Sequence, residues 1–570
     1  MQCALAREKK MGLVDNSFYH QNLNSTKVLV LIPHQDDEIN VAGNTIKNFN
    51  DLGAEVHVCY STNGDYIIPA SIRISEAISA LDILGCSKEN IHFMGYGDSL
   101  NNNSQGHIFY SKENTITSMA GYEETYAACG DKDYSFQYQN KHNQYNSNCF
   151  HNDLKHLILE LMPDVIICVD LDTHADHRML SLAFDDVMGE ILHENSNYNP
   201  TVLKRFAYCL AYFADNDFYQ INLFSNKKPR VNREKNYFQA FIDTAYYQWN
   251  SRIRLPVICG EYSTFLFNKT LTKALKCHKS QSAVMHAGQI INGDEVFFRR
   301  RTDSISYTAK VETSSGNGRY LNDFRILGLD DIDSMVMQYA DYLWIPEEKD
   351  SEKKAVFRWE QPQNICKVVI YGNADGNGRI NKIRISFDNG FEIISSKLLR
   401  NGTPLEINFD LQQNVSFCSL QILECEGDNY GIAECEFYSN FEEKILLNPL
   451  IKILIDDDFA YELLIDEDTH ELPISFYSYD SKLSEKVKFI NGKGYVSCGK
   501  LYLDDGKKFV LRLESVDNST IYDQIVIYRK SNNFIKCYKF IQFIEAKVSR
   551  ILFRAMRKCF YVTNKLRKLK

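Results

Sequence analysis

The chain has 570 residues, of which 44% are hydrophobic, 12% aromatic and 24% charged, and its formal net charge is −10. A chain of this length exceeds what one hydrophobic core usually holds, and its aromatic content excludes a disordered or low-complexity protein, so we expect several packed domains. The negative net charge provides no overall attraction to nucleic acid, and no nucleic-acid partner is expected.

The cysteines and the N-terminal segment bear on the cellular location. Sixteen cysteines are scattered along the chain without Cys-x-x-Cys spacing, which favours reduced thiols over a disulfide scaffold. Residues 1–27 lack the apolar stretch of a signal peptide, and no other segment has the length and apolar character of a membrane span. The expected location is therefore cytoplasmic, with a peripheral position at the inner face of the cell membrane left open.

Short apolar runs alternate with amphipathic stretches between residues 27 and 193, which is typical of buried parallel strands joined by crossover helices. A polar stretch at 101–148 is too long for an ordinary connection and is interpreted as a lid or substrate loop. This part predicts an α/β domain with a Rossmann-like, mostly parallel sheet. Its strands are expected at 28–32, 55–60, 91–94 and 165–169, and its helices at 38–50, 71–84 and 152–162.

The pattern changes beyond about residue 324 to an alternation of period two with turn signals, which predicts an antiparallel β-sandwich. A second β-rich block follows, and a basic helical tail ends the sequence. The predicted fold class is therefore α/β, followed by one or two β-sandwich domains and a C-terminal helix. The four predicted parts are 22–325, 326–440, 441–530 and 531–570.

A first group of polar residues follows the predicted strand 28–32, in the run Pro33-His34-Gln35-Asp36-Asp37-Glu38. Open α/β sheets bind their ligands at the carboxyl ends of strands. His34 and Asp37 can both reach one divalent ion across a tight turn, while Asp36 stays free as a base beside a bound water.

A second group, His174-Ala175-Asp176-His177, follows the predicted strand 165–169 and so reaches the same edge of the sheet. There His177 can complete a His-Asp-His site with an open position for water. An acidic pair after a strand is more often a helix cap, and a lone histidine is more often an ordinary residue. Two such groups on equivalent strand ends are costly to bury without a shared ion, so we favour the metal site.

These two runs resemble the signatures of the PIG-L/LmbE-like family of zinc-dependent N-acetylglucosaminyl deacetylases, which read Pro/Ala-His-Pro-Asp-Asp-Glu and His-Pro-Asp-His. The resemblance covers about residues 26–303. Gln35 and Ala175 replace the two internal prolines of the signatures. Neither proline is a ligand, so the replacements should loosen the turns more than they alter the chemistry. Further similarity is found at Thr62, Gly64 and Arg73.

The resemblance implies that His34, Asp37 and His177 bind Zn²⁺, and another divalent metal stays open. It makes Asp36 the general base, and it gives His174 the role of stabilising the oxyanion or protonating the leaving amine. Zinc with three protein ligands and an open position lowers the pKa of a bound water toward ~7 and polarises an amide carbonyl.

Other positions of the first domain have less certain roles. Asp176 is expected to orient its neighbours rather than to catalyse. Arg73 and Asp98 match family positions that bind sugar hydroxyls or a neighbouring anionic group, and a buried ion pair that supports the loops explains them equally well. Segment 277–281, Cys-His-Lys-Ser-Gln, also recurs in such relatives, and for it we predict packing at a helix end.

The later parts suggest binding surfaces. Residues 342–438 resemble a discoidin-like, galactose-binding-type β-sandwich, for which glycan binding and a purely structural spacer are both open. Tail residues 534–570 place apolar side chains at helical spacing among basic ones, with Glu545 as their only acidic residue. Such a helix is typical of peripheral contact with anionic lipid headgroups, and packing on the preceding β domain is the alternative.

The function expected from these features is hydrolytic removal of an N-acetyl or other N-acyl group from an amino sugar in a glycan, a glycolipid or their precursor. One alternative is a catalytically silent glycan-binding protein, against which the intact Asp36, Asp37, His174 and His177 argue. The other is a metal-dependent amidohydrolase with a non-sugar substrate, which a shared fold alone does not exclude.

Overall fold

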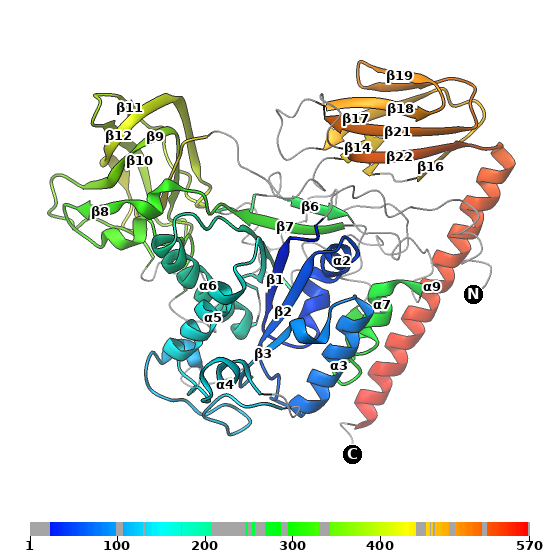
Figure 1. Cartoon of the computed structure of the whole chain (residues 1–570), viewed down its shortest axis with the longest axis horizontal. Coiled ribbons are helices and arrows are strands. Elements are labelled where there is room, and N and C mark those ends of the chain that lie inside the picture. The colour runs from blue at the N-terminus through cyan, green and yellow to red at the C-terminus, as the bar shows by residue number, and fades with distance from the viewer. Residues whose placement is uncertain are drawn as a thin grey trace.

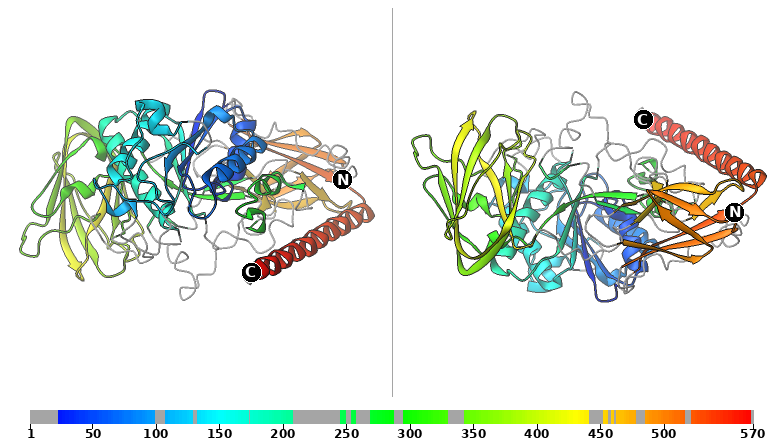
Figure 2. Two further views of the ribbon diagram at one scale, coloured as in Figure 1. Left: turned by 90° about the horizontal axis from the view of Figure 1, so that it is seen from below. Right: turned by 90° about the horizontal axis from the view of Figure 1, so that it is seen from above.

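The computed structural model places three β-rich regions and a long C-terminal helix in one chain (Figure 1). The two later β regions lie on opposite sides of the α/β domain (Figures 1 and 2). The residues that the structure describes are 23–98, 107–128, 132–172, 174–207, 245–248, 253–256, 268–286, 294–329, 342–440, 452–455, 458–459, 462–477, 485–515 and 521–567.

The α/β domain is built on a seven-stranded sheet with the order β3-β2-β1-β4-β5-β7-β6. The first five strands pair in parallel, whereas β7 pairs antiparallel with both β5 and β6. Their bounds are β1 Lys27–Ile32, β2 Glu55–Thr62, β3 Ile91–Tyr96, β4 Val165–Val169, β5 Thr201–Arg205, β6 Ile253–Pro256 and β7 Asp294–Arg300. The predicted α/β class with a mostly parallel sheet is confirmed.

Helices cover both faces of this sheet (Figure 1). One face carries α5 (Ser147–Leu161) and α6 (Ala175–Glu194), which contact each other. The other face carries α2 (Asp37–Asp51), α3 (Ala70–Ile83) and α7 (Thr270–Leu275). Because both faces are covered, the strands bury nearly all of their side chains, and each fully buried Val, Leu or Ile contributes about 1.5–3 kcal/mol.

The position of β1 in the sheet creates the site. It lies between β2 and β4, with Leu31 opposite Cys59 on one side and Cys168 on the other. All three strands run in the same direction, so the segments that follow them meet at one edge. The two polar groups predicted to share a site are therefore neighbours.

The polar stretch interpreted as a lid has some structure of its own. It contains a 3₁₀ turn, η4 (Ile108–Tyr110), and a short helix, α4 (Tyr134–Gln139). Residues 99–106 and 129–131 lie outside the described part of the chain. Within the described part, side chains from this stretch, Tyr134 and Tyr145 among them, join the core of the α/β domain.

The second β region is an antiparallel sheet with the order β11-β10-β12-β9-β13, to which β8 adds by pairing with β9. The long strands β9 and β12 bend at register shifts and enclose a separate hydrophobic core. The bounds are β8 Lys310–Thr313, β9 Lys354–Gly372, β10 Arg379–Phe387, β11 Glu392–Ile394, β12 Leu405–Glu426 and β13 Ile432–Tyr438. The predicted domain bounds stay a prediction, although β8 precedes the bound at residue 325 and pairs with the second region.

The third β region consists of two sheets around a third hydrophobic core. One sheet has the order β15-β14-β17-β20-β19, and the other has the order β16-β22-β21-β18. Their bounds are β14 Lys452–Ile455, β15 Asp458–Phe459, β16 Glu462–Ile465, β17 Glu471–Tyr477, β18 Glu485–Asn491, β19 Gly494–Ser497, β20 Lys500–Leu503, β21 Lys508–Ser515 and β22 Ile521–Arg529.

Helix α9 (Asn532–Arg567) follows β22 and returns along the molecule toward α7 (Figure 1). Its Phe553 is buried in the core of the α/β domain, and Met556 packs against the same core. The helix contacts the short turn η11 (Ala283–His286). In the described residues, no helix combines the length and apolar character needed to cross a membrane.

Candidate metal centre and active site

The loop after β1 holds Asp36 in an unusual backbone conformation. Asp36 has a φ of 127°, which a side chain with a Cβ rarely adopts, and it directly precedes helix α2. Its backbone N–H donates to Oε2 of Glu38 at 2.9 Å, and Oε1 of Glu38 pairs with Nε2 of His278. Contacts from outside the loop therefore maintain the strained residue.

The same loop is clamped to the end of β2. The side-chain amide of Gln35 donates to the carbonyl of Thr62 at 2.8 Å, and the Thr62 hydroxyl donates to the carbonyl of Pro33 at 2.9 Å. Arg73 donates to the carbonyls of Gln35 and Gly64 at 3.0 and 3.1 Å. Gly64 has a φ of 61°, and a Cβ there would lie 2.4 Å from Oε1 of Gln35. Gln35 thus supplies a bond that offsets the looseness expected without the family's proline.

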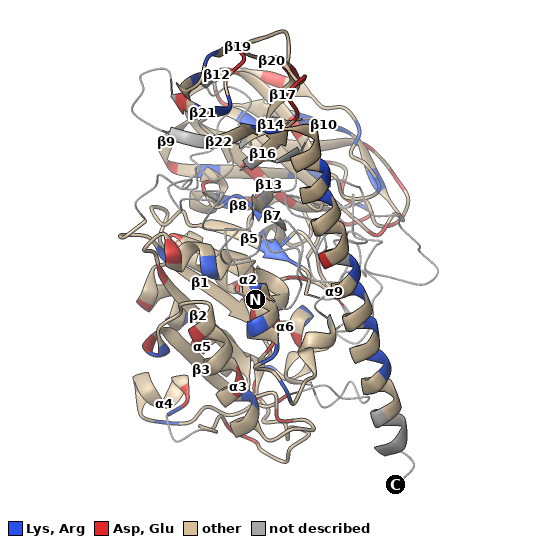
Figure 3. Ribbon diagram, turned by 90° about the vertical axis from the view of Figure 1, so that its right-hand side faces the viewer, with Lys and Arg blue, Asp and Glu red and all other residues tan. Residues whose placement is uncertain are grey.

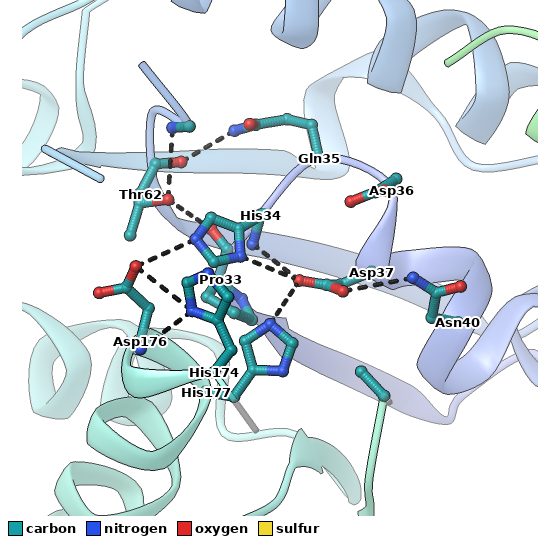
Figure 4. Close-up of polar contacts among 12 residues, drawn as sticks. Pro33, His34, Gln35, Asp36, Asp37, Asn40, Thr62, His174, Asp176 and His177 are labelled. Carbon is teal, nitrogen blue, oxygen red and sulfur yellow. Dashed lines mark hydrogen bonds and ion pairs between the residues drawn. The ribbon is translucent and has the colours of Figure 1, made fainter. Parts of the chain in front are cut away.

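The three predicted metal ligands are in contact, because both histidines reach the same carboxylate oxygen of Asp37 (Figure 4). Oδ2 of Asp37 lies 3.2 Å from Nδ1 of His34 and 3.0 Å from Nε2 of His177. The other oxygen of Asp37 accepts from the side chain of Asn40 at 3.4 Å, which orients the carboxylate. Donor atoms around a tetrahedral zinc with bonds of ~2.0–2.1 Å lie about 3.3 Å apart, so the two distances from Asp37 are compatible with such an ion.

In each histidine of this set, the ring nitrogen that does not face Asp37 contacts another carboxylate. Nδ1 of His177 pairs with Asp172 at 2.8 Å, and Nε2 of His34 pairs with Asp176 at 3.1 Å. Asp176 also pairs with Nε2 of His107 at 3.0 Å. Such carboxylate–histidine contacts set the ring orientation and raise the basicity of metal ligands. Asp176 therefore lies where an orienting residue was predicted.

Sequence reasoning missed Asp172 and His107. Asp172 follows strand β4, the same signal that drew attention to Asp36 and Asp37, and it could have been found from that position. His107 lies at the start of η4 in the long polar stretch, and its sequence neighbours give no sign of a role. Only the fold brings it to Asp176.

Electrostatics at this point favour a cation. Burial by itself lowers the pKa of His34, but neighbouring carboxylates outweigh it and raise the pKa well above its usual value. Burial also opposes the charge on His177, whose pKa Asp172 and Asp37 nevertheless raise to about 9. Although burial acts to raise it, the pKa of Asp37 is lowered well below its ordinary value by His177 and His34. Buried carboxylates here outnumber the fixed positive charges, and a divalent ion would fit that imbalance.

Other groupings of potential ligand atoms overlap this set. Among the described residues, His34, His174 and His177 bring ligand atoms within 4.8 Å of one another, as do His34, Asp98 and Asp176. Both groupings share His34 with the predicted set. The first grouping contains both predicted histidine ligands, whereas the second gathers around Nε2 of His34 and includes Asp98, which follows β3.

Burial shifts the pKa values of Asp36 and His174 in opposite directions. Burial, followed by the neighbouring charge of Asp37, raises the pKa of Asp36 to about 7. Burial and the nearby rings of His34 and His177 lower the pKa of His174 to about 4, so His174 is neutral at pH 7. Nδ1 of His174 accepts the backbone N–H of Asp176 at 3.2 Å, which leaves the proton of the neutral ring on Nε2.

A pocket of about 200 Å³ opens beside these groups. Arg73 and Asp98 both line it and lie 3.9 Å apart, so the substrate-binding and the ion-pair interpretations of these two residues are compatible. Arg73 also lies 3.6 Å from Oδ1 of Asp36. The complete lining is His34, Asp36, Tyr66, Ile67, Ile68, Arg73, Asp98, His174 and Gln281.

Segment 277–281 belongs to the site, so the prediction of helix-end packing was incomplete. His278 is buried against Glu38, as described above. Ser280 donates its backbone N–H and its hydroxyl to Glu76 of α3, at 2.9 and 2.6 Å. These two anchors place Gln281 in the lining of the pocket. Because α3 also carries Arg73, one helix positions residues on two sides of the pocket.

Comparison with known proteins agrees with the two motifs. Residues 29–188 match the family described as "PIG-L: GlcNAc-PI de-N-acetylase". The chain is 32% identical over 93 residues to the probable N-acetylglucosaminyl-phosphatidylinositol de-N-acetylase of Dictyostelium discoideum. That match covers 16% of this chain and only 34% of the relative, so the chain spans about a third of the length of this curated protein. The match to the PIG-L family therefore covers residues 29–188, which contain both motifs.

Two solved structures also show some similarity. One is the N,N'-diacetylchitobiose deacetylase from Pyrococcus horikoshii, with 17% identity and a TM-score of 0.21 over 36% of this chain and 68% of that one. The other is the family 32 carbohydrate-binding module of NanJ from C. perfringens, with 16% identity and a TM-score of 0.17 over 23% of this chain and 94% of that one. We base no conclusion on either similarity, because both scores are low.

Proposed function

We propose that this protein is a metal-dependent de-N-acetylase that cleaves the amide of an N-acetylglucosamine-type sugar. The observation that carries the proposal is that His34 and His177 both contact one buried oxygen of Asp37, beside a pocket lined by His34, Asp36 and His174. The PIG-L family match over residues 29–188 supports the same reaction.

His34, Asp37 and His177 would hold the metal, with Zn²⁺ as the expected ion. When bound there, zinc would polarise the amide carbonyl and acidify water, which is the chemistry it supplies in hydrolases with three protein ligands. Asp172 and Asp176 keep the two histidine rings in place.

Asp36 is proposed as the general base. Its carboxyl group lines the pocket, and a pKa near 7 suits a group that must take a proton from the attacking water and release it later. Its strained backbone, held by Glu38, fixes where that carboxyl group sits.

His174 is proposed to act on the other side of the substrate. Because its ring is neutral and carries the proton on Nε2, it can donate a hydrogen bond to the oxygen that becomes negative as water adds to the carbonyl. The C–N bond then breaks, and the nitrogen leaves as an amine after gaining the proton that Asp36 took from the water. The products are acetate and the free amino sugar.

The lining of the pocket favours a hydroxylated substrate over an apolar amide. Arg73, Asp98 and Gln281 supply a cation, an anion and an amide within one small pocket, and sugar hydroxyls need both donors and acceptors. This is the reason for preferring an amino sugar to a non-sugar substrate. Glycan binding by the β8–β13 region stays a prediction from its sequence resemblance.

The test is amine release by the purified full-length protein, measured together with its metal content. The substrates are N-acetylglucosamine, N,N'-diacetylchitobiose and an N-acetylglucosamine-containing glycolipid, with N-acetyl amino acids as non-sugar amides. We expect equal amounts of acetate and amine from at least one sugar, loss of both after chelation, and recovery with Zn²⁺.

The other outcomes separate the alternatives. If amine is released from N-acetyl amino acids but from none of the sugars, the substrate is a non-sugar amide and not an amino sugar. Saturable sugar binding without amine release, in protein carrying one metal ion per chain, would make it a glycan-binding protein.

A further inference from the structure

Helix α9 exposes an apolar face that no described part of the chain covers. Phe540, Phe543 and Ile551 are 62%, 60% and 58% exposed, which is unusual for side chains of this size. The other exposed large apolar residues of the helix are Phe534, Ile544, Val548, Leu552, Tyr561 and Val562. Scattered exposed apolar residues are ordinary, but a row of them along one helix marks an interaction surface.

The opposite face of α9 already has its partners. Ile535, Ser549 and Phe553 are buried and recur at the spacing of one helical face. Phe553 joins the core of the α/β domain, and the helix contacts η11, directly after the segment that carries Gln281. Helix α9 is therefore docked on the α/β domain through one face, and the exposed apolar residues lie on its other face.

Basic residues recur along the length of α9, where Lys and Arg are blue in Figure 3. Glu545 is the only acidic residue within α9, although the whole chain has a net charge of −10. Among the residues of α9 whose exposure the structure describes, the exposed basic ones are Lys536, Lys539, Lys547, Arg554 and Lys558. On helical spacing, Lys547, Arg554 and Lys558 fall next to Phe540, Phe543 and Ile551, so cationic and apolar groups share one surface.

We infer that this outer face of α9 binds the surface of an anionic phospholipid bilayer, with its apolar side chains in the headgroup region and its lysines and arginines at the lipid phosphates. A nucleic acid would match the charges but would leave the apolar row exposed, whereas a bilayer surface accepts both. The helix lies on the membrane and does not cross it. The inference is independent of the proposed reaction, since it uses no residue of the pocket.

Sedimentation of the full-length protein with vesicles tests the inference. The probes are vesicles of phosphatidylcholine alone and of phosphatidylcholine with about one quarter phosphatidylglycerol, at ~0.05 M and ~0.5 M salt. We expect binding to the anionic vesicles at low salt, with weaker binding at high salt and to the uncharged vesicles. No sedimentation with anionic vesicles at low salt, or equal binding to both lipid compositions, would overturn the inference.

Two variants of the full chain assign the binding to this face. Replacing Lys547, Arg554 and Lys558 by Gln should weaken partitioning about a hundredfold, because each basic residue contributes about fivefold (~1 kcal/mol) at an anionic surface. Replacing Phe540, Phe543 and Ile551 by Ser should abolish sedimentation, because the apolar side chains that enter the headgroup region are then missing. Unchanged thermal unfolding would show that both variants fold, as their exposed side chains lead us to expect.

Matched controls carry similar changes elsewhere on the surface. The basic control replaces three exposed lysines of the β regions by Gln: Lys310, Lys382 and Lys500. The apolar control replaces three exposed apolar residues of the β regions by Ser: Ile394, Leu411 and Tyr495. Both controls should bind vesicles as the original chain does. Equal loss in the controls would contradict the assignment to α9. A third outcome would also contradict the inference: the protein binds no vesicles but forms a concentration-dependent dimer, and the apolar variant abolishes that dimer. The outer face of α9 would then contact a second copy of the chain.

Discussion

The loop after β1 and the outer face of α9 use charged residues in opposite ways. In the loop, Asp37 is fully buried, and two histidines contact one of its oxygens. On α9, Lys539 and Arg554 are exposed beside apolar side chains. A buried charge depends on its partners, since removing one leaves an uncompensated charge at a cost of about 3–5 kcal/mol, whereas an exposed charge loses little. Substitutions should therefore have their largest effects at the buried charged residues of the predicted metal site and smaller ones at residues that only support it.

The largest expected effect comes from removing a metal ligand. His177→Ala and Asp37→Ala should each lose the bound metal and reduce amine release by more than about a hundredfold, because two protein donors remain. Metal analysis of the purified variants and the amine assay measure the two effects. His156→Ala is the matched control, since His156 is partly exposed and pairs with Tyr134. One zinc per chain in both ligand variants would place the metal elsewhere.

Replacing the base should separate catalysis from metal binding. Asp36→Asn keeps the shape of the side chain but cannot take a proton, so kcat should fall about 10²–10⁴-fold while the metal content stays the same. Asp51→Asn, at the end of the same helix, removes only a surface ion pair with Lys47 and should change kcat less than about threefold. Full activity of Asp36→Asn would exclude this residue as the base.

The pH profile should sharpen the assignment of Asp36. Its carboxyl group acts as a base only when it is deprotonated, and its pKa is raised to about 7 by burial and by Asp37. Activity should therefore increase with pH along a limb at or below about pH 7, since a bound dication favours the carboxylate form. The low pKa of His174 keeps that ring neutral across this range. A rising limb that persists unchanged in Asp36→Asn would contradict the assignment.

The contact between His278 and Glu38 should affect catalysis only by positioning Asp36. His278→Leu removes the partner that holds Glu38, and Glu38 in turn holds the backbone of Asp36, so kcat should fall about 10–100-fold with nearly unchanged KM and metal content. His278→Gln can still donate to Glu38 and should recover part of the activity. If both variants lose activity equally, or if both lose their metal, the positioning role is wrong.

The smallest effect within the loop should come from Gln35. Gln35→Ala removes one hydrogen bond to the carbonyl of Thr62 and should lower the free energy of unfolding by about 1 kcal/mol, with activity reduced only a fewfold. Gln361→Ala, at an exposed position of β9, is the control and should leave the free energy of unfolding within about 0.5 kcal/mol of the original. Denaturant unfolding measures the difference. An unchanged midpoint for Gln35→Ala would mean that the side chain does not replace the proline of the family.

Sequence reasoning could locate the site but not all of its residues. The apolar runs before His34 and before His174 predicted two strands, and residues after parallel strands meet at one edge of a sheet. Asp172 carried the same signal and was overlooked. His107 carried no comparable signal, and His278 carried only the family resemblance of segment 277–281. Neither role could be derived locally, because their partners Asp176 and Glu38 lie 69 and 240 residues away in the chain.

The sequence by itself determined the order of strands and helices, the residues that could bind a metal, and the amphipathic character of the tail. These follow from local periodicity and from side-chain chemistry, which neighbouring residues encode. The tertiary structure alone decided that His278 supports Glu38, that Gln281 enters the pocket, and which face of α9 remains exposed. Those facts depend on contacts between distant segments, and such contacts form only when the whole domain packs around its core.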